Sequence, residues 1–243
     1  MSWYKVTFKQ IQPIHLGYKK HGVINETRVF ITGQMMWGAL VNAYGRVKNW
    51  NSDEYEQNQT LFENISCFYP MIDNEVLYPK FEEGEFYLGN YSENEFRKNY
   101  TTTLLSTAIN PNTRNAKDES LHELDVILPN NIYWVGYVQC DKMKLEELKE
   151  IYIGGDSRYG LGLIKLEEII EESYAQNPIK GKIEEYSSLN TSITNFVKFN
   201  NQKFEGKLEI LAEFDFNKNR PKVVESGLYI SVGSKIKGNT DVR

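Results

Sequence analysis

Cysteine and histidine are scarce in this chain of 243 residues, and their scarcity excludes two kinds of site. The only cysteines are Cys67 and Cys140, which are too few for a disulfide framework or a cysteine-based zinc site. We therefore expect two ordinary reduced thiols. The histidines, His15, His21 and His122, have no partners at metal-ligand spacing, so we expect no metal and no other cofactor.

Long apolar runs are also missing. No run of about 18 apolar residues occurs, so we expect no membrane-spanning helix and no membrane partner. The opening stretch "MSWYKVTFKQ" alternates as a β-strand does and lacks the apolar centre of a secretory signal. Hydrophobic residues make up 40% of the chain and charged residues 25%, as in soluble globular proteins. These observations predict a cytoplasmic protein.

An overall basic excess is absent, because the formal net charge is −5, and this argues against a simple nucleic-acid coat. The charge is nevertheless uneven. Residues 51–96 are acidic, with Lys80 as their only base, whereas residues 97–117 carry four bases and no acid. Residues 218–237 are also mainly basic. Local fields decide what binds, so either these stretches are solvated loops or the basic ones meet an anionic partner.

The periodicity predicts an α+β domain. Residues 3–11, 132–139 and 161–166 read as strands, and helical patterns follow residue 33 and cover 145–152. The order resembles the split βαβ unit of a ferredoxin-like domain. We expect a core in residues 1–170 with an insertion at 50–130, and a β-rich extension of the same domain in 171–243. Within the insertion, residues 106–128 predict a long hairpin with a polar tip.

One candidate site is the strand-to-helix turn in "FITGQMMWGALVNAYG", residues 30–45. Thr32 is a candidate N-cap, and Gly33 would let an anion reach the free amides of the first helical turn. Gly38 costs about 1 kcal/mol in a helix interior, which the close approach of a strand or an RNA backbone at Gly38 and Ala39 would offset. The alternative is a helix packed tightly on its sheet, with no ligand.

Two further stretches have compositions suited to phosphates. The glycine-rich "GGDSRYGLG", residues 154–162, places Arg158 among four glycines and suits close contact with phosphates or sugars. It leads into a strand, so it is neither a Walker loop nor a Rossmann fingerprint. Its alternative is a turn packed on a sheet end. Arg114 and Lys117 lie at the hairpin tip, which would reach a nucleic acid or be an ordinary exposed hairpin.

Two histidines share a loop with basic and aromatic residues. His15 and His21 flank Tyr18, Lys19 and Lys20. A histidine with such neighbours can cleave RNA without a metal, acting as general base and electrostatic stabiliser. The alternative is a pair of RNA-contacting or merely solvated side chains.

Taken together, these motifs resemble those of the RAMP superfamily, the RNA-binding subunits of CRISPR effector complexes, and most closely those of type III. The resemblance rests on "FITGQMMWGAL", "TAINPNTRNAKDESLHELDVILP" and "GGDSRYGLG" in this order, and it covers roughly residues 1–167. It implies a ferredoxin-like, RRM-related fold in which residues 106–128 form a thumb that folds over the guide RNA.

The resemblance implies a non-catalytic subunit that holds guide RNA (crRNA) in antiviral defence, together with other effector subunits and, indirectly, target RNA. It places the turn at Thr32 and Gly33 on guide phosphates. With the residue-level reading above, it gives these expected RNA-binding residues: His15, Lys19, Lys20, His21, Arg28, Thr32, Gly33, Gln34, Trp37, Arg114, Lys117, Gly154, Gly155, Ser157 and Arg158.

The sequence departs from the family pattern before the glycine helix. Target-cleaving backbone subunits of this family carry an aspartate there, whereas "GYKKHGVINETRVFITG" contains only Glu26, and the usual "PGSS" is "TGQM". This favours a cap on the 5′ handle of the guide or a non-cleaving backbone copy. Three alternatives remain open: a metal-independent repeat endoribonuclease using His15 or His21, a target-cleaving subunit using Glu26, and a protein–protein adaptor with no RNA role.

Overall fold

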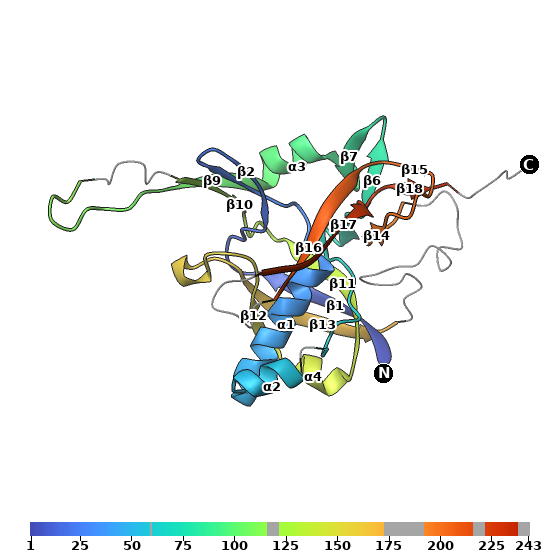
Figure 1. The fold of residues 1–243 in the computed structure, drawn as a ribbon, viewed down its shortest axis with the longest axis horizontal. Helices are drawn as coiled ribbons and strands as arrows, with labels where there is room; N and C mark the ends of the chain where they lie inside the picture. The colour runs from blue at the N-terminus through green and yellow to red at the C-terminus, as the bar shows by residue number, and fades with distance from the viewer. Residues whose placement is uncertain (59, 116–121, 173–191, 216–221, 238–243) are drawn as a thin grey trace, which may run out of the picture.

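The computed structural model describes residues 1–58, 60–115, 122–172, 192–215 and 222–237 (Figure 1). These residues form a strand-rich mixture of β-sheets and short helices. No helix in the described ranges is long and apolar enough to cross a membrane.

A six-stranded antiparallel sheet forms the centre of the molecule. Its order is β12-β13-β1-β11-β4-β5, so β11 separates β1 from β4, the strand that follows the first helices. Part of the expected insertion therefore belongs to this sheet, because β4 pairs with β11. The strands are β1 (Ser2–Gln10), β4 (Tyr69–Ile72), β5 (Glu75–Val76), β11 (Tyr133–Cys140), β12 (Glu150–Tyr152) and β13 (Leu163–Glu171).

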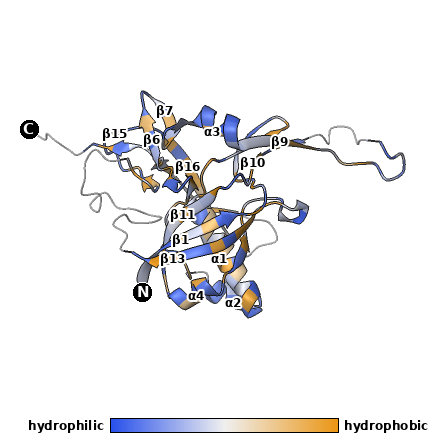
Figure 2. Ribbon diagram, turned by 180° about the vertical axis from the view of Figure 1, so that it is seen from behind, coloured by the Kyte–Doolittle hydropathy of each residue, from blue (hydrophilic) through white to orange (hydrophobic). Residues whose placement is uncertain are grey.

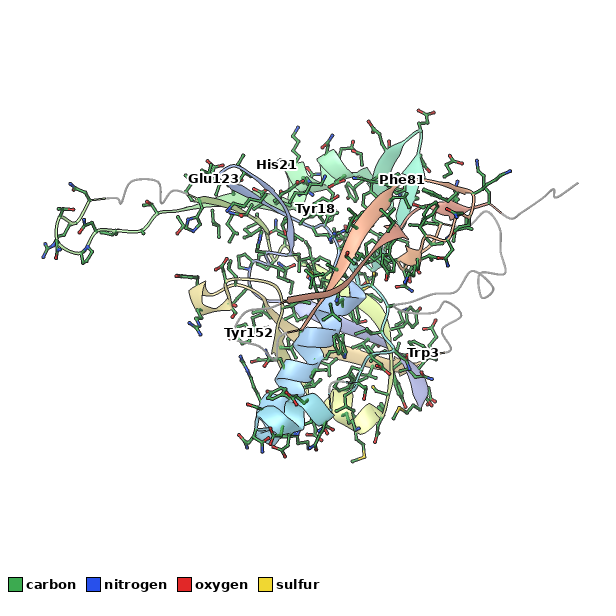
Figure 3. The ribbon with its side chains drawn as sticks, in the orientation of Figure 1. Trp3, Tyr18, His21, Phe81, Glu123 and Tyr152 are labelled. Carbon is green, nitrogen blue, oxygen red and sulfur yellow. The ribbon has the colours of Figure 1, made fainter. Side chains whose placement is uncertain are left out.

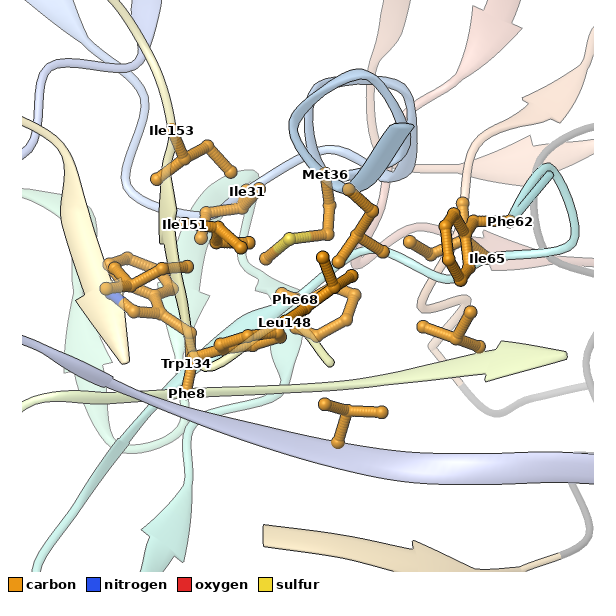
Figure 4. Close-up of a cluster of buried hydrophobic side chains, with 14 of the residues drawn as sticks. Phe8, Ile31, Met36, Phe62, Ile65, Phe68, Trp134, Leu148, Ile151 and Ile153 are labelled. Carbon is orange, nitrogen blue, oxygen red and sulfur yellow. The ribbon is translucent and has the colours of Figure 1, made fainter. Parts of the chain in front are cut away.

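The main core lies between this sheet and helix α1 (Gly33–Lys48), with α2 (Ser52–Gln57) and α4 (Lys142–Glu146) nearby (Figures 1 and 4). Met36 and Leu40 of the helix pack with Phe8 and Trp134 of the sheet, and all four side chains are fully buried. Removing so much apolar surface from water drives the association of helix and sheet.

One predicted helix is wrong beyond its first turn. The apolar stripe at 145–152 predicted a single helix, but α4 ends at Glu146 and residues 150–152 form β12, where Ile151 pairs with Ile164. Leu145, Leu148 and Ile151 are buried as expected. The spacing of three apolar residues thus gave their burial correctly, but it did not reveal the strand β13 that supplies backbone partners to β12.

A second sheet has the order β2-β3-β10-β9 and carries the predicted thumb. β9 (Thr101–Ser106) and β10 (His122–Ile127) form an antiparallel hairpin that projects from the body in both Figures 1 and 2. β2 (Gly17–His21) and β3 (Ile24–Thr27) form a shorter hairpin, and β3 pairs with β10 in parallel. The sheet therefore joins the histidine-containing loop to the thumb.

Helix α3 (Glu93–Tyr100) and several of the remaining strands contribute side chains to a second buried core. Helix α3 runs directly into β9, and Phe96 of this helix is buried with Phe30, Tyr69, Phe196 and Tyr229. The strands are β6 (Pro79–Glu82), β7 (Glu85–Leu88), β8 (Tyr91–Ser92), β14 (Val197–Lys198), β15 (Phe204–Glu205), β16 (Leu208–Asp215), β17 (Lys222–Ile230) and β18 (Lys235–Ile236).

Both cysteines are buried and free, in agreement with the expected reduced thiols. Burial raises the pKa of Cys67 to about 11 and the pKa of Cys140 to about 12. Neither side chain is therefore a thiolate near neutral pH, and both act as small apolar residues.

The start of α1 is packed against the chain itself. Thr32 is the N-cap, as predicted, and its hydroxyl accepts the Met35 N–H at 3.2 Å. Gly33 is buried, and a Cβ there would lie 3.1 Å from the carbonyl oxygen of Ile65 and 3.2 Å from that of Ser66. The space that Gly33 leaves is therefore taken by main-chain carbonyls, which corrects the expectation that it exposes the amides to a ligand.

Three other α1 residues that the sequence analysis singled out are Gln34, Trp37 and Gly38. The Trp37 indole N–H donates to the Leu61 carbonyl at 2.9 Å, and the ring packs on the main core. Gln34 is exposed. Gly38 is also exposed, and a Cβ there would meet nothing within 4 Å. Among the residues that the structure describes, no strand approaches Gly38, which leaves an open helix surface at this position.

Arg28 belongs to a buried ion pair, contrary to its expected place among the RNA contacts. Its guanidinium lies 2.9 Å from the Glu209 carboxylate of β16, and the two side chains are only 11% and 13% exposed. The guanidinium also lies 4.4 Å from the centre of the Tyr18 ring. Arg28 thus ties the β-rich C-terminal part to the segment that follows β3.

The two glycines of α1 predict opposite stability effects. Gly33→Ala should lower the free energy of unfolding by about 1–3 kcal/mol, because its Cβ would crowd two carbonyls. Gly38→Ala should raise it by about 0.5–1 kcal/mol, because alanine favours an open helix interior. Urea denaturation of both variants measures this. A Gly33→Ala variant as stable as the wild type would contradict the packing described here.

The buried ion pair predicts a pH-dependent loss of stability. Burial acts to raise the pKa of Glu209, but Arg28 and the Ser231 hydroxyl, 2.7 Å away, bring it below its ordinary value. A depressed pKa stabilises the fold above about pH 4.3, the unfolded value, and this stability is lost as the pH falls through the folded pKa. Glu209→Gln should therefore cost about 3 kcal/mol at pH 7, and less below pH 4.

The matched control is Glu205→Gln. Glu205 pairs with Lys237 at 3.3 Å, but both side chains are 57% exposed, so its removal should change the stability by less than about 1 kcal/mol. Urea unfolding of both variants at neutral and acid pH makes the comparison. Equal effects of the two substitutions at pH 7 would refute the special role of the Arg28 pair.

Candidate nucleic-acid interface

Three predicted stretches meet at His15, in the segment between β1 and β2. The imidazole Nδ1 lies 2.7 Å from the Asp125 carbonyl oxygen of β10, and since a carbonyl only accepts, Nδ1 carries the proton. The His15 carbonyl accepts the Gly155 N–H at 3.1 Å. His15 is buried. It therefore links the glycine-rich loop to the thumb strand.

The base of the glycine-rich loop needs glycine for a packing reason. Gly154 has φ +80°, and a Cβ there would collide with the His15 carbonyl oxygen. Gly162 has φ +90°, and its N–H donates to the Pro13 carbonyl at 2.9 Å. The close backbone approach that the sequence predicted is thus made, at the loop base, by the protein's own main chain.

The tip of the loop is free of such packing. Residues Ser157–Tyr159 form a 3₁₀ turn, and Ser157 and Arg158 are exposed. The Tyr159 ring is 83% exposed. The loop tip therefore presents the Arg158 guanidinium, the Ser157 hydroxyl and the Tyr159 ring to solvent. It lies on the side of the molecule toward which the thumb projects (Figure 1).

The β2 strand presents the other predicted cations. Lys19, Lys20 and His21 are exposed, and Lys19 Nζ lies 4.6 Å from the centre of the Tyr18 ring. His21 Nε2 lies 3.9 Å from a Glu26 oxygen. Figure 3 shows Tyr18, His21 and Glu123 in the same part of the molecule, where β2 and the thumb strands belong to one sheet.

At the thumb tip, the structure describes only part of the prediction. Arg114 is exposed with φ +57°, and its N–H donates to the Asn110 carbonyl at 2.8 Å. Lys117 lies outside the described residues. The tip therefore offers at least one exposed cation in a turn closed by main-chain hydrogen bonds.

Glu26 forms an ion pair with Arg97, a residue that the sequence analysis did not assign to the site. Arg97 of α3 contacts the Glu26 carboxylate at 2.9 Å and the Glu93 carboxylate at 2.7 Å, and it donates to the Thr27 carbonyl at 2.9 Å. The i,i+4 spacing of Glu93 and Arg97 was the available signal. Arg97 thus fixes the thumb base on β3.

Among the described residues, no group of three or more histidine, cysteine, aspartate or glutamate side chains is placed to hold a metal ion. The structure joins His15, Gly154 and Gly155 at one point. It leaves Lys19, Lys20 and His21 exposed on β2, Ser157 and Arg158 exposed at the loop tip, and Arg114 exposed in the turn beyond β9. Thr32, Gly33, Trp37 and Arg28 make capping, packing, hydrogen-bond or ion-pair contacts within the protein.

Comparisons with known proteins give matches in three dimensions only. No protein-family model matches the chain, and no curated protein sequence is significantly similar to it. A chain of the Type III-B Cmr-beta complex bound to cognate target RNA aligns with a TM-score of 0.65 and 13% identity, covering 96% of this chain and 86% of that one. A chain of the same complex bound to cognate target RNA and AMPPnP aligns with a TM-score of 0.63 and 12% identity, covering 96% of this chain and 86% of that one.

A type III-A structure agrees with these. A chain of the Csm3-Csm4 subcomplex of the type III-A CRISPR-Cas interference complex aligns with a TM-score of 0.51 and 14% identity, covering 98% of this chain and 93% of that one. Identities this low establish the fold alone. The chain shares its fold with chains of these type III CRISPR complexes, which agrees with the resemblance that its motifs predicted.

Proposed function

We propose that this chain is a non-catalytic, RNA-binding subunit of a type III-like CRISPR effector complex and holds guide RNA in antiviral defence. The observation that carries the proposal is the junction at His15, which binds the glycine-rich loop to the thumb strand within a fold shared with type III subunits. The complexes that contain those relatives include target RNA. The guide, other effector subunits and, indirectly, target RNA would be its partners in the cytoplasm.

The exposed chemistry around the junction suits single-stranded RNA. Lys19, Lys20 and Arg158 supply charge for phosphates, and Tyr159 offers a ring on which a base can stack. The thumb would fold over the bound strand, with Arg114 near its tip. A chain of net charge −5 can bind RNA in this way because local fields, rather than the overall charge, decide what binds.

We also propose that the core is ferredoxin-like. The central strands follow the order β13-β1-β11-β4 with antiparallel neighbours, and α1 lies between β1 and β4 in the sequence. This is the split βαβ arrangement in which one strand separates the two that a helix connects. The thumb and the C-terminal strands would then be additions to this core.

The arrangement favours binding over cleavage. His15 is buried with Nδ1 bound to a carbonyl, and His21 lies at the far end of β2. The two imidazoles are therefore not placed to act on one phosphate. Glu26 is held by Arg97, which opposes a role as a metal-binding catalytic carboxylate. The subunit would act as the 5′-handle cap or as a non-cleaving backbone copy.

RNA binding can be tested by one matched pair of triple variants. Replacing Lys19, Lys20 and Arg158 by alanine should weaken binding to repeat-spacer RNA at least about tenfold and reduce the salt dependence by about two released counterions. The control replaces Arg46, Lys142 and Lys149, which are exposed cations beyond the proposed surface. It removes the same charge and should leave the affinity nearly unchanged.

The same binding experiment also shows whether the RNA stays intact. Gel shifts run with EDTA and with Mg²⁺ should both show intact RNA. Cleavage in EDTA that is lost in His15→Ala or His21→Ala would instead support the repeat endoribonuclease, and Mg²⁺-dependent cleavage lost in Glu26→Gln would support the target-cleaving subunit. Equal affinities of the two triple variants would contradict the proposed surface.

A further inference from the structure

Within the described part of the chain, no strand pairs with the outer edge of the thumb strand β9. β9 is the last strand in the order β2-β3-β10-β9, and its six residues pair with β10 without a register shift. All its residues after Thr101 are exposed, and the Leu105 side chain is 70% exposed. Alternate N–H and C=O groups of β9 therefore face outward without strand partners.

The other long sheet edges of this protein are protected, which makes β9 an exception. Proteins guard free edges with charged side chains and bulges, because an unguarded edge pairs with another strand. β2 carries Lys19 and Lys20, and its pairing with β3 has a register shift. β16, which is the edge of another sheet, also has a register shift in its pairing with β17. β9, with the sequence "TTTLLS", has neither a charge nor a shift.

We propose that β9 is a strand-addition site and that its occupant is β9 of a second copy of this chain. Two copies would pair antiparallel about a two-fold axis and join their four-stranded sheets into one. β9 carries no charged side chain, so no like charges meet when two copies of it pair. The thumb projects from the body, which leaves this edge accessible (Figures 1 and 2).

The proposal does not rest on RNA binding, because the paired groups are main-chain atoms of β9. It makes the exposed Leu105 part of an interface. Leu105 lies opposite Glu123 of β10, so Leu105→Lys places a charge on the edge and gives it an acidic neighbour within the same hairpin. The variant should therefore fold and fail to pair.

Sedimentation of the RNA-free full chain over a wide concentration range tests this directly. The wild type should form a dimer as the concentration rises, and Leu105→Lys should weaken the association at least about tenfold. The control is Ile210→Lys, which charges another exposed apolar residue on an edge strand, 74% exposed on β16. It should associate like the wild type.

Hydrogen exchange locates the interface in the same samples. Amides of residues 101–106 should gain protection as the wild type associates, and they should gain none in Leu105→Lys. Circular dichroism and thermal unfolding verify that the variant is folded. A wild type that stays monomeric at its highest soluble concentration, or a Leu105→Lys variant that associates as well as the wild type, would overturn the proposal. Loss of the dimer in Ile210→Lys alone would do the same and assign the contact to β16.

Discussion

The arrangement of the candidate interface depends on one close main-chain packing, the approach of Gly154 to His15. Only a residue without a Cβ and with a positive φ can lie there, and the neighbouring Gly155 N–H then binds the His15 carbonyl. The imidazole of the same residue reaches the Asp125 carbonyl of the thumb strand. The His15 main chain thus holds the glycine-rich loop and its imidazole holds the thumb strand, so a single residue fixes the two segments relative to each other.

Electrostatics divides the basic residues into two groups with different tasks. Arg28 and Arg97 are turned inward, where their planar guanidinium groups bind carboxylates and hold β3 to the C-terminal strands and to the thumb base. Lysines 19 and 20, together with Arg158, remain exposed on the surface around His15. The carboxylates of Glu26, Glu93 and Glu209 are therefore paired with these two arginines.

Sequence reasoning found the elements that local patterns determine. The alternation of β1 and the N-cap at Thr32 follow from neighbours in the chain, and the structure confirms them. The predicted hairpin is present, but its first strand covers Thr101–Ser106 and so begins before the predicted residues 106–128. It failed where a distant partner decides. The sequence at Gly33 does not reveal whether a main-chain carbonyl or a ligand fills the space beside the glycine. The ion pair of Arg28 was not predicted because its partner Glu209 lies 181 residues away in the chain. Residues 150–152 became a strand because β13 was available to pair with them.

The central claim is that RNA lies on the surface around His15, and cross-linking tests it most directly. Ultraviolet cross-linking of the purified chain to repeat-spacer RNA, followed by mass spectrometry of the peptides, locates the contact without any substitution. The account predicts cross-links in β2 around Lys19, at Tyr159 in the glycine-rich loop, and in the thumb. Cross-links confined to α2 and α4, with none in these three segments, would contradict it.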